Sequence, residues 1–135
     1  MREVTASRVV DADPGEVWAR FDPPAIVEAE GSFTVESIED EGEATIVVAS
    51  GPGIQLPLRF EYREDTIYYT QDGKQGPFSH METWLECEPA DGGTRVTLRS
   101  SVSLSAPLPF GDRIAAWKRN GELKRALEAI ESTFA

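Results

Sequence analysis

Apolar and polar residues alternate along most of the chain, in short runs that turn residues separate. The runs that favour strands, by alternation or by β-branched content, are residues 3–10, 32–39, 43–50, 55–62, 66–71, 78–88 and 94–104. Glu41-Gly42, Asp72-Gly73 and Asp91-Gly92-Gly93 lie between consecutive runs and are typical of hairpin turns. The apolar parity of residues 32–39 changes at Ile38, which indicates a bulge. The pattern predicts an antiparallel, meander-like sheet of six to seven strands.

Two short helices are predicted between the first two strands. Asp13 is a favourable N-cap, Pro14 suits the first helical position, and Glu16 follows three residues after the cap. Pro23-Pro24 is expected to end this helix. Residues 24–29 are expected to form a second helical turn.

A long helix is predicted over residues 111–134, and its apolar stripe is uneven. The C-terminal half of the stripe is apolar, whereas its N-terminal half holds Arg113, Ala116 and Asn120. We expect the helix to pack tightly on the sheet at its C-terminal end and to leave a gap at its N-terminal end. Such a gap is the usual form of a small-molecule site. At about 100° per residue the stripe comprises Ala116, Asn120, Leu123, Leu127, Ile130 and Phe134.

Length and composition narrow the functional classes. The chain has 135 residues, and this length predicts one domain over residues 1–135. Its formal net charge of −11 opposes binding to nucleic acid or to anionic lipid. One cysteine and one histidine exclude an internal disulfide and a His/Cys-rich metal site, so we expect neither a metal nor a cofactor. No apolar run approaches the roughly 20 residues that span a bilayer, and no signal-peptide core is present. These features predict a soluble, cytoplasmic protein rather than a membrane protein.

The basic residues divide unevenly, with ten arginines and only three lysines against 24 acidic residues. An acidic surface poor in lysine is typical of proteins that work in high salt, where charge repulsion is screened. The composition therefore favours a halophilic source, although an ordinary acidic cytosolic protein is the alternative.

Three stretches resemble the START/Bet v 1-like (SRPBCC) superfamily, and most closely its polyketide cyclase/dehydrase-like members. Residues 9–18 (VVDADPGEVW) are similar to the opening motif v-x-A-x-P-x-x-V-W. Residues 85–89 and 93–98 resemble the L-x-P…G-T-x-V-x-L hairpin, and residues 121–128 resemble the closing helix. The resemblance implies an α+β helix-grip fold: a curved antiparallel sheet wrapped around a long C-terminal helix, with two short helices after the first strand.

The resemblance also implies a cavity between the sheet and the long helix. Its mouth would be ringed by residues 50–54, 72–77 and 105–110. The apolar side chains expected at this rim are Ile54, Phe78, Leu108 and Phe110.

Strand parity and the helical stripe together predict the ligand-binding residues that line the cavity. Arg113 and Asn120 would supply hydrogen bonds to a ligand carbonyl or carboxylate. The alternatives are that Arg113 reaches solvent or a nearby carboxylate, and that Asn120 bonds a strand hydroxyl such as Ser100. The predicted lining is Phe33, Ile46, Val48, Leu58, Phe60, Tyr69, Met81, Val102, Arg113, Ala116, Asn120 and Leu123.

No residue is assigned a catalytic role. Met81, Thr83, Leu85 and Cys87 share the more apolar parity of their strand, so His80 is expected on the outer face or near the mouth. Cys87 is expected to be a buried, inert thiol. The adjacent Tyr68 and Tyr69 must point to opposite faces, one inward and one outward.

Three functions remain open from the sequence. The preferred one is binding or carriage of a small hydrophobic molecule (a lipid, isoprenoid or aromatic) without catalysis. The alternatives are a polyketide cyclase/dehydratase-like enzyme and a protein-interaction module, associated with a chaperone or the ribosome, which an exposed apolar or tryptophan patch would favour. We expect a small hydrophobic ligand as the partner, no nucleic acid, and at most a weak homodimer.

Overall fold

The computed structural model describes residues 1–73, 76–105 and 109–135, and in these ranges seven strands form one antiparallel sheet. The strand order is β1-β7-β6-β5-β4-β3-β2, so strands consecutive in sequence are neighbours from β2 to β7, and β1 pairs with β7. The meander predicted from the turn signals is confirmed. The strands are β1 (Arg2–Val10), β2 (Thr34–Glu41), β3 (Ala44–Gly51), β4 (Ile54–Arg63), β5 (Thr66–Gln71), β6 (Phe78–Ala90) and β7 (Gly93–Leu104).

The short helices follow β1. α1 (Pro14–Arg20) has Asp13 as its N-cap residue and Pro14 at its start, as predicted. α2 (Pro23–Glu30) contains the second helical turn predicted over residues 24–29 and begins at the same proline pair that is expected to end the first helix. The Asp22 carboxylate accepts a hydrogen bond of 3.1 Å from the backbone N–H of Ala25, so Asp22 caps α2 and the prolines occupy its first turn.

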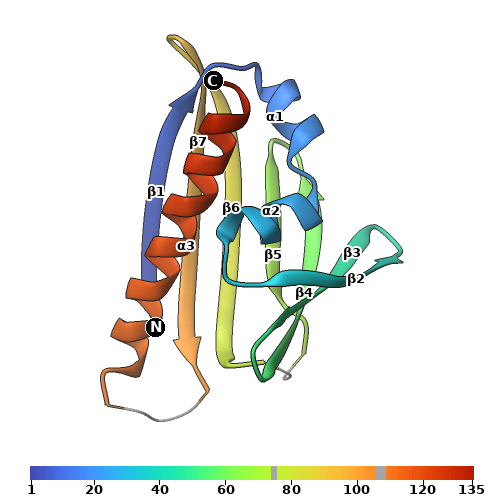
Figure 1. Ribbon diagram of the computed structural model, residues 1–135, viewed down its shortest axis with the longest axis vertical. Coiled ribbons are helices and arrows are strands. Elements are labelled where there is room, and N and C mark those ends of the chain that lie inside the picture. Colours follow the sequence, from blue (N-terminus) through green and yellow to red (C-terminus); the bar gives the residue numbers. More distant parts are fainter. Residues whose placement is uncertain (74–75, 106–108) are drawn as a thin grey trace.

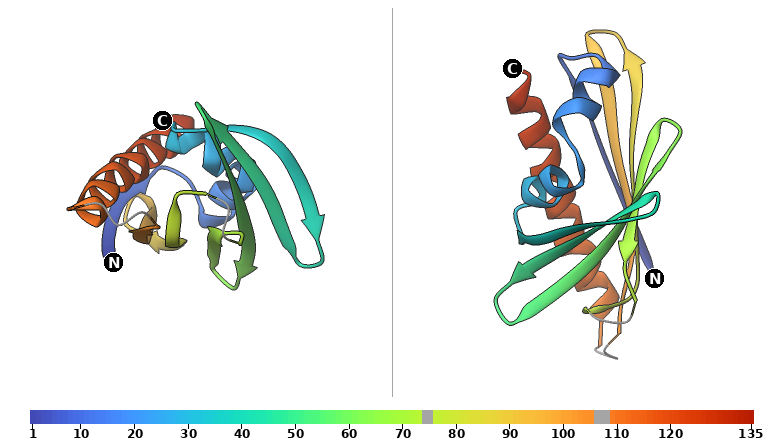
Figure 2. Two further views of the ribbon diagram at one scale, coloured as in Figure 1. Left: turned by 90° about the horizontal axis from the view of Figure 1, so that it is seen from below. Right: turned by 90° about the vertical axis from the view of Figure 1, so that its right-hand side faces the viewer.

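The long helix α3 (Gly111–Thr133) runs diagonally across one face of the sheet (Figure 1). It packs mainly on β1, β7 and α2. The sheet curves, with α3 along one side and β2–β4 on the other (Figure 2). This is the helix-grip arrangement expected from the sequence. No helix in the described ranges is long and apolar enough to cross a bilayer.

Sheet register decides which side chains face α3. The register of β2 against β3 shifts between Val35 and Ser37, which confirms the predicted bulge. Directly opposed residues of antiparallel strands point to the same face. In β3 and β4, Val47 lies opposite the inward-facing Leu58, and Ala49 lies opposite Leu56.

The same register corrects two predicted cavity residues. Ile46 lies opposite Arg59, and Val48 lies opposite Pro57, so both point to the outer face of the sheet. Residues 43–50 are apolar on both faces, and their own pattern therefore carried no information about which face is buried.

Candidate functional site

A cavity of about 370 Å³ lies between the sheet and the N-terminal half of α3, where the uneven stripe predicts it. Most of its wall is apolar and comes from β4, β6, the ends of the neighbouring strands, and α2. Polar side chains enter from the end of α2, from β5 and from α3. The lining residues are Val27, Glu30, Ser32, Phe33, Pro52, Ile54, Leu56, Leu58, Tyr69, Pro77, Phe78, Met81, Leu104, Ile114, Ala115, Lys118, Arg119 and Glu122.

Part of the predicted lining is found in this wall. Phe33, Leu58, Tyr69 and Met81 line the cavity, as do the expected rim residues Ile54 and Phe78. Leu108, also expected at the rim, lies outside the described residues. Whether any of these side chains contacts a ligand stays a prediction.

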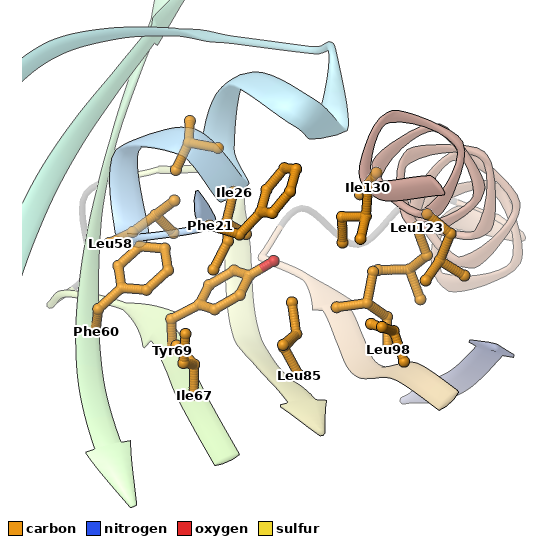
Figure 3. Packing of buried hydrophobic residues seen from close by; sticks show 14 of the residues in the cluster. Phe21, Ile26, Leu58, Phe60, Ile67, Tyr69, Leu85, Leu98, Leu123 and Ile130 are labelled. Carbon is orange, nitrogen blue, oxygen red and sulfur yellow. The ribbon is translucent and has the colours of Figure 1, made fainter. Parts of the chain in front are cut away.

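Other predicted residues lie elsewhere. Phe60, Val102, Ala116 and Leu123 face inward but belong to the close-packed core and do not reach the cavity wall. Phe60, for example, is fully buried because it stacks on Tyr69, with ring centroids 4.4 Å apart (Figure 3). Phe110 is 71% exposed and borders a shallow depression with Ile114 and Trp117, outside the cavity.

The two polar residues predicted from α3 do not line the cavity either. Arg113 is exposed, with its guanidinium 5.8 Å from the Phe110 ring, and Asn120 is only half-buried. The buried face of α3 is turned about 60° from the predicted stripe. It brings Arg119 and Glu122 inward instead, with residue exposures of 5% and 6%.

Arg119 is the centre of a buried hydrogen-bonded cluster. Its Nη1 donates to Glu30 at 2.5 Å and to Glu122 at 3.0 Å. Its Nη2 donates to the Tyr69 hydroxyl at 2.6 Å and to Thr83 Oγ1 at 2.8 Å. Its Nε donates to Ser100 Oγ at 3.0 Å, so the strand hydroxyl that was considered a partner for Asn120 is bound by Arg119.

Tyr69 connects the cluster to the sheet. It points from β5 toward the helices, with its ring packed in the apolar core (Figure 3). Its hydroxyl donates to Glu30 and accepts from Arg119. The inward orientation of Tyr69, opposite to that of Tyr68, follows from strand alternation; the hydrogen-bond partners of Tyr69 come from two helices.

The position of Glu30 depends on how α2 ends. Glu30 is the last residue of α2, and Gly31 follows with a φ of 81°, a left-handed conformation that favours glycine. Arg125 Nε donates to the Glu30 carbonyl at 2.9 Å across the same turn. A Cβ at Gly31 would lie 2.9 Å from Arg125 Nε, so a side chain here would adopt a strained φ and push Arg125 away from the Glu30 carbonyl.

The electrostatics of the cluster keep its groups in defined protonation states. Burial raises the pKa of Tyr69, and the nearby negative charge of Glu30 raises it further. The positive charge of Arg119 acts in the opposite direction but is outweighed, so the phenol stays protonated. Burial opposes the charge on Arg119, but the carboxylate of Glu30 and its other partners raise its pKa well above the usual range. Burial alone would raise the pKa of Glu122, yet Arg119 attraction and a Ser32 hydrogen bond lower it overall.

The sequence analysis does not identify Glu30, Arg119 or Glu122, because charged residues in a helical pattern are expected on the face that points to solvent. One signal was available. Ala115, Arg119, Glu122 and Ala126 recur at spacings of four, three and four, which places two charges between small residues on one helical face. A charged pair flanked by alanines on that face indicates that its partner lies on another element.

The other reactive residues are outside the cavity. His80 Nε2 lies 3.3 Å from Glu82 on the outer face of the sheet, consistent with its expected parity. Cys87 is buried as expected, and burial raises the pKa of its thiol to about 12. In the part of the chain that the structure describes, no cluster of His, Cys, Asp or Glu side chains is arranged to hold a metal ion.

The tryptophans differ in their surroundings. Trp84 lies on the outer face, where the Arg99 guanidinium is 4.1 Å from its ring centroid and Tyr68 packs beside it. Trp117 is 79% exposed on α3. Trp84 is therefore partly covered by Arg99 and Tyr68, whereas Trp117 presents an exposed indole.

Comparison with known proteins gives one family match over the whole chain. The model of the family described as "Polyketide cyclase / dehydrase and lipid transport" matches residues 1–135. No curated protein matches the chain.

Several solved structures share the fold at low sequence identity. TTHA0849 from Thermus thermophilus is 22% identical, with a TM-score of 0.69 over 99% of this chain and 100% of that one. A START superfamily protein from Mycobacterium smegmatis is 15% identical, with a TM-score of 0.73 over 98% and 96% of the two chains. The di-domain ARO/CYC BexL of the BE-7585A biosynthetic pathway is 22% identical, with a TM-score of 0.69; the match covers 98% of this chain and 46% of BexL.

Proposed function

Because this chain belongs to the polyketide cyclase / dehydrase and lipid transport family, we propose that it binds a small, mainly apolar molecule in the cavity between the sheet and α3. The observation that carries this proposal is the cavity itself: an apolar wall with a single group of polar side chains on one side. Cavities of this size and composition are typical small-molecule sites, in which apolar surface gives affinity and a few polar groups give orientation.

Burial of apolar surface sets the expected affinity. Each buried CH₂ contributes about 0.8 kcal/mol, so a ten-carbon chain supplies roughly 8 kcal/mol before losses. Association then costs several kcal/mol in lost translational and rotational freedom. The balance predicts a Kd in the micromolar to millimolar range for a simple aliphatic ligand.

A fluorescence titration tests the proposal. A neutral naphthalene dye, N-phenylnaphthylamine, gains fluorescence in an apolar site and should bind the parent protein and be displaced by n-decanol. Ala115→Phe adds a ring to the cavity wall and should weaken dye binding roughly tenfold or more. Ala129→Phe is the matched control, since Ala129 lies on the same helix beyond the cavity and is half-buried. Equal dye binding by the two variants would place the site elsewhere.

A cyclase-type enzyme is a second candidate, and the buried cluster is the observation that favours it. Tyr69 carries a phenol hydroxyl and Glu122 a carboxylate, and both side chains line the same mainly apolar cavity. Such a pair can donate and accept protons during an aldol cyclisation and the loss of water that follows it. BexL, a structural neighbour, is named as a di-domain ARO/CYC.

The two candidates differ in a measurable product. A linear poly-β-ketone thioester should be recovered unchanged after incubation with a carrier, whereas a cyclase releases one water and yields a cyclic product detectable by mass spectrometry. Tyr69→Phe keeps the ring and its stacking on Phe60 but removes the hydroxyl. It should abolish turnover in an enzyme and leave apolar dye binding nearly unchanged in either case.

A further inference from the structure

The buried arginine directs all its donors to protein groups. A guanidinium has five N–H donors. Those of Arg119 are directed to Ser100, Glu30, Glu122, Tyr69 and Thr83, at 2.5–3.0 Å. A ligand carboxylate that approached Arg119 would have to displace one of these partners, and the group left behind would be buried without its hydrogen bond.

The carboxylate of Glu122, unlike the guanidinium of Arg119, still has hydrogen-bonding capacity that protein groups do not use. Its Oε1 accepts from Arg119 at 3.0 Å, its Oε2 lies 3.5 Å from the Lys118 ammonium, and the Ser32 hydroxyl donates a third hydrogen bond to the carboxylate. An ionised carboxylate offers about four lone-pair sites. With three partners, Glu122 lines the cavity with room for about one more donor. Tyr69, in contrast, already donates to Glu30 and accepts from Arg119.

Charge adds to this asymmetry. Among the described residues, the deeply buried part of the cluster contains one cation, Arg119, and two carboxylates, Glu30 and Glu122. Lys118 supplies the balancing charge from the solvent-exposed margin, because its side chain is 60% exposed. A third anion placed among these two carboxylates, away from Lys118, would be repelled in a medium where charges are poorly screened.

We propose that the polar head of the bound molecule is a hydrogen-bond donor such as a hydroxyl, received by Glu122, and that the cavity discriminates against carboxylates in spite of its buried arginine. This inference rests on the proposed function, namely that an apolar molecule enters the cavity. It narrows the ligand class from any amphiphile to neutral, hydroxyl-bearing ones. A fatty acid, the ligand that a buried arginine would ordinarily suggest, is disfavoured.

A matched pair of ligands tests the inference. n-Decanol and decanoate share a hydrocarbon chain and differ in the head group, so each is titrated against the protein loaded with N-phenylnaphthylamine. The titrations are run at about pH 8, where a carboxylate is ionised, and at about 1 M KCl, where the Debye length of about 3 Å suppresses repulsion by the overall charge of −11. n-Decanol should displace the dye with an affinity roughly tenfold or more above that of decanoate.

Two charge-matched variants separate the local effect from the global one. Glu122→Gln removes a carboxylate in the cavity wall and should bring the two affinities to within about threefold. Glu128→Gln removes one from the exposed face of the same helix and should leave the tenfold preference intact. If both variants reduce the preference for n-decanol over decanoate equally, the preference comes from the net charge of the protein and the inference is overturned.

Each remaining outcome is also decisive. Equal or tighter binding of decanoate by the parent protein overturns the inference while leaving the apolar site in place. If Lys118→Met then abolishes decanoate binding, the head group sits at the exposed margin and not at Glu122. Failure of the dye and both ligands to bind overturns the proposed function and this inference together. Thermal melts show whether Glu122→Gln is folded, and the comparison of the two ligands on the parent protein does not depend on any variant.

Discussion

Arg119 of α3 and Glu30 of α2 are 89 residues apart in sequence, yet their side chains form an ion pair of 2.5 Å. Both side chains are nearly inaccessible, at 5% and 10% exposure. The pair joins the two helices that cover the cavity, and Tyr69 and Thr83 tie it to the sheet. A structural anchor and the polar end of the candidate site are thus the same group of atoms.

Removing the cation should be costly. Arg119→Met leaves two carboxylates buried without their partner, and breaking a buried pair in this way typically costs about 3–5 kcal/mol. The triple variant Glu30→Gln, Arg119→Met, Glu122→Gln removes all three charges and should recover much of that loss. Urea unfolding curves measure both. A single variant within about 0.5 kcal/mol of the parent would show that the cluster contributes little to stability.

Acid should weaken the fold partly through Glu122. Its pKa is lowered from 4.5 in the folded state, so the ionised carboxylate stabilises the fold above pH 4.5. That contribution is lost as the pH falls below 4.5 toward the lower folded value. The stability advantage of the parent over Glu122→Gln should therefore shrink through this window, as measured by denaturant unfolding at a series of pH values.

Glu128→Gln is again the surface control for the acid effect. It removes a carboxylate from the exposed side of α3. If its stability relative to the parent follows pH in the same way as that of Glu122→Gln, the acid response does not come from the buried pair.

Gly31 should tolerate alanine poorly. The substitution forces a left-handed φ of 81° on a residue with a side chain and brings its Cβ to 2.9 Å from Arg125 Nε. We expect a loss of about 1–3 kcal/mol in the free energy of unfolding. Gly42→Ala is the matched control, since Gly42 has a φ of 66° but no atom within 4 Å of the added Cβ. Equal losses at the two positions would mean that the contact with Arg125 carries no cost.

Salt should stabilise the protein if its acidic surface is an adaptation to high salt. Glu39, Asp40 and Glu43 are exposed around the turn between β2 and β3, where their negative charges lie close together and repel. At 1 M KCl the Debye length is about 3 Å, so this repulsion is largely screened. The Tm should rise steeply from low to molar KCl, and Glu39→Gln with Asp40→Asn should reduce the rise. A Tm that does not change with KCl would contradict the halophilic interpretation.

The sequence by itself determined the elements and their order. Strand alternation, turn dipeptides and the Asp13-Pro14 start act over a few residues, so the local chain contains all the information they need. The inward orientation of Met81 and Cys87 followed in the same way, because their strand has one clearly more apolar parity. The family resemblance, which rests on three local motifs, was confirmed for the same reason.

Tertiary structure alone decided the polar end of the cavity. A charged residue in an amphipathic pattern is ordinarily placed toward water, since burying an unpaired ion is costly. Arg119 and Glu122 are buried because Glu30, Tyr69, Thr83 and Ser100 come together around them from α2, β5, β6 and β7. The buried face of α3 includes Arg119 and Glu122 of this non-local cluster, and Asn120 lies outside the cavity wall. The pattern of residues 111–134 gives no information about where Glu30 lies. The polar end of the cavity therefore could be identified only from the folded structure.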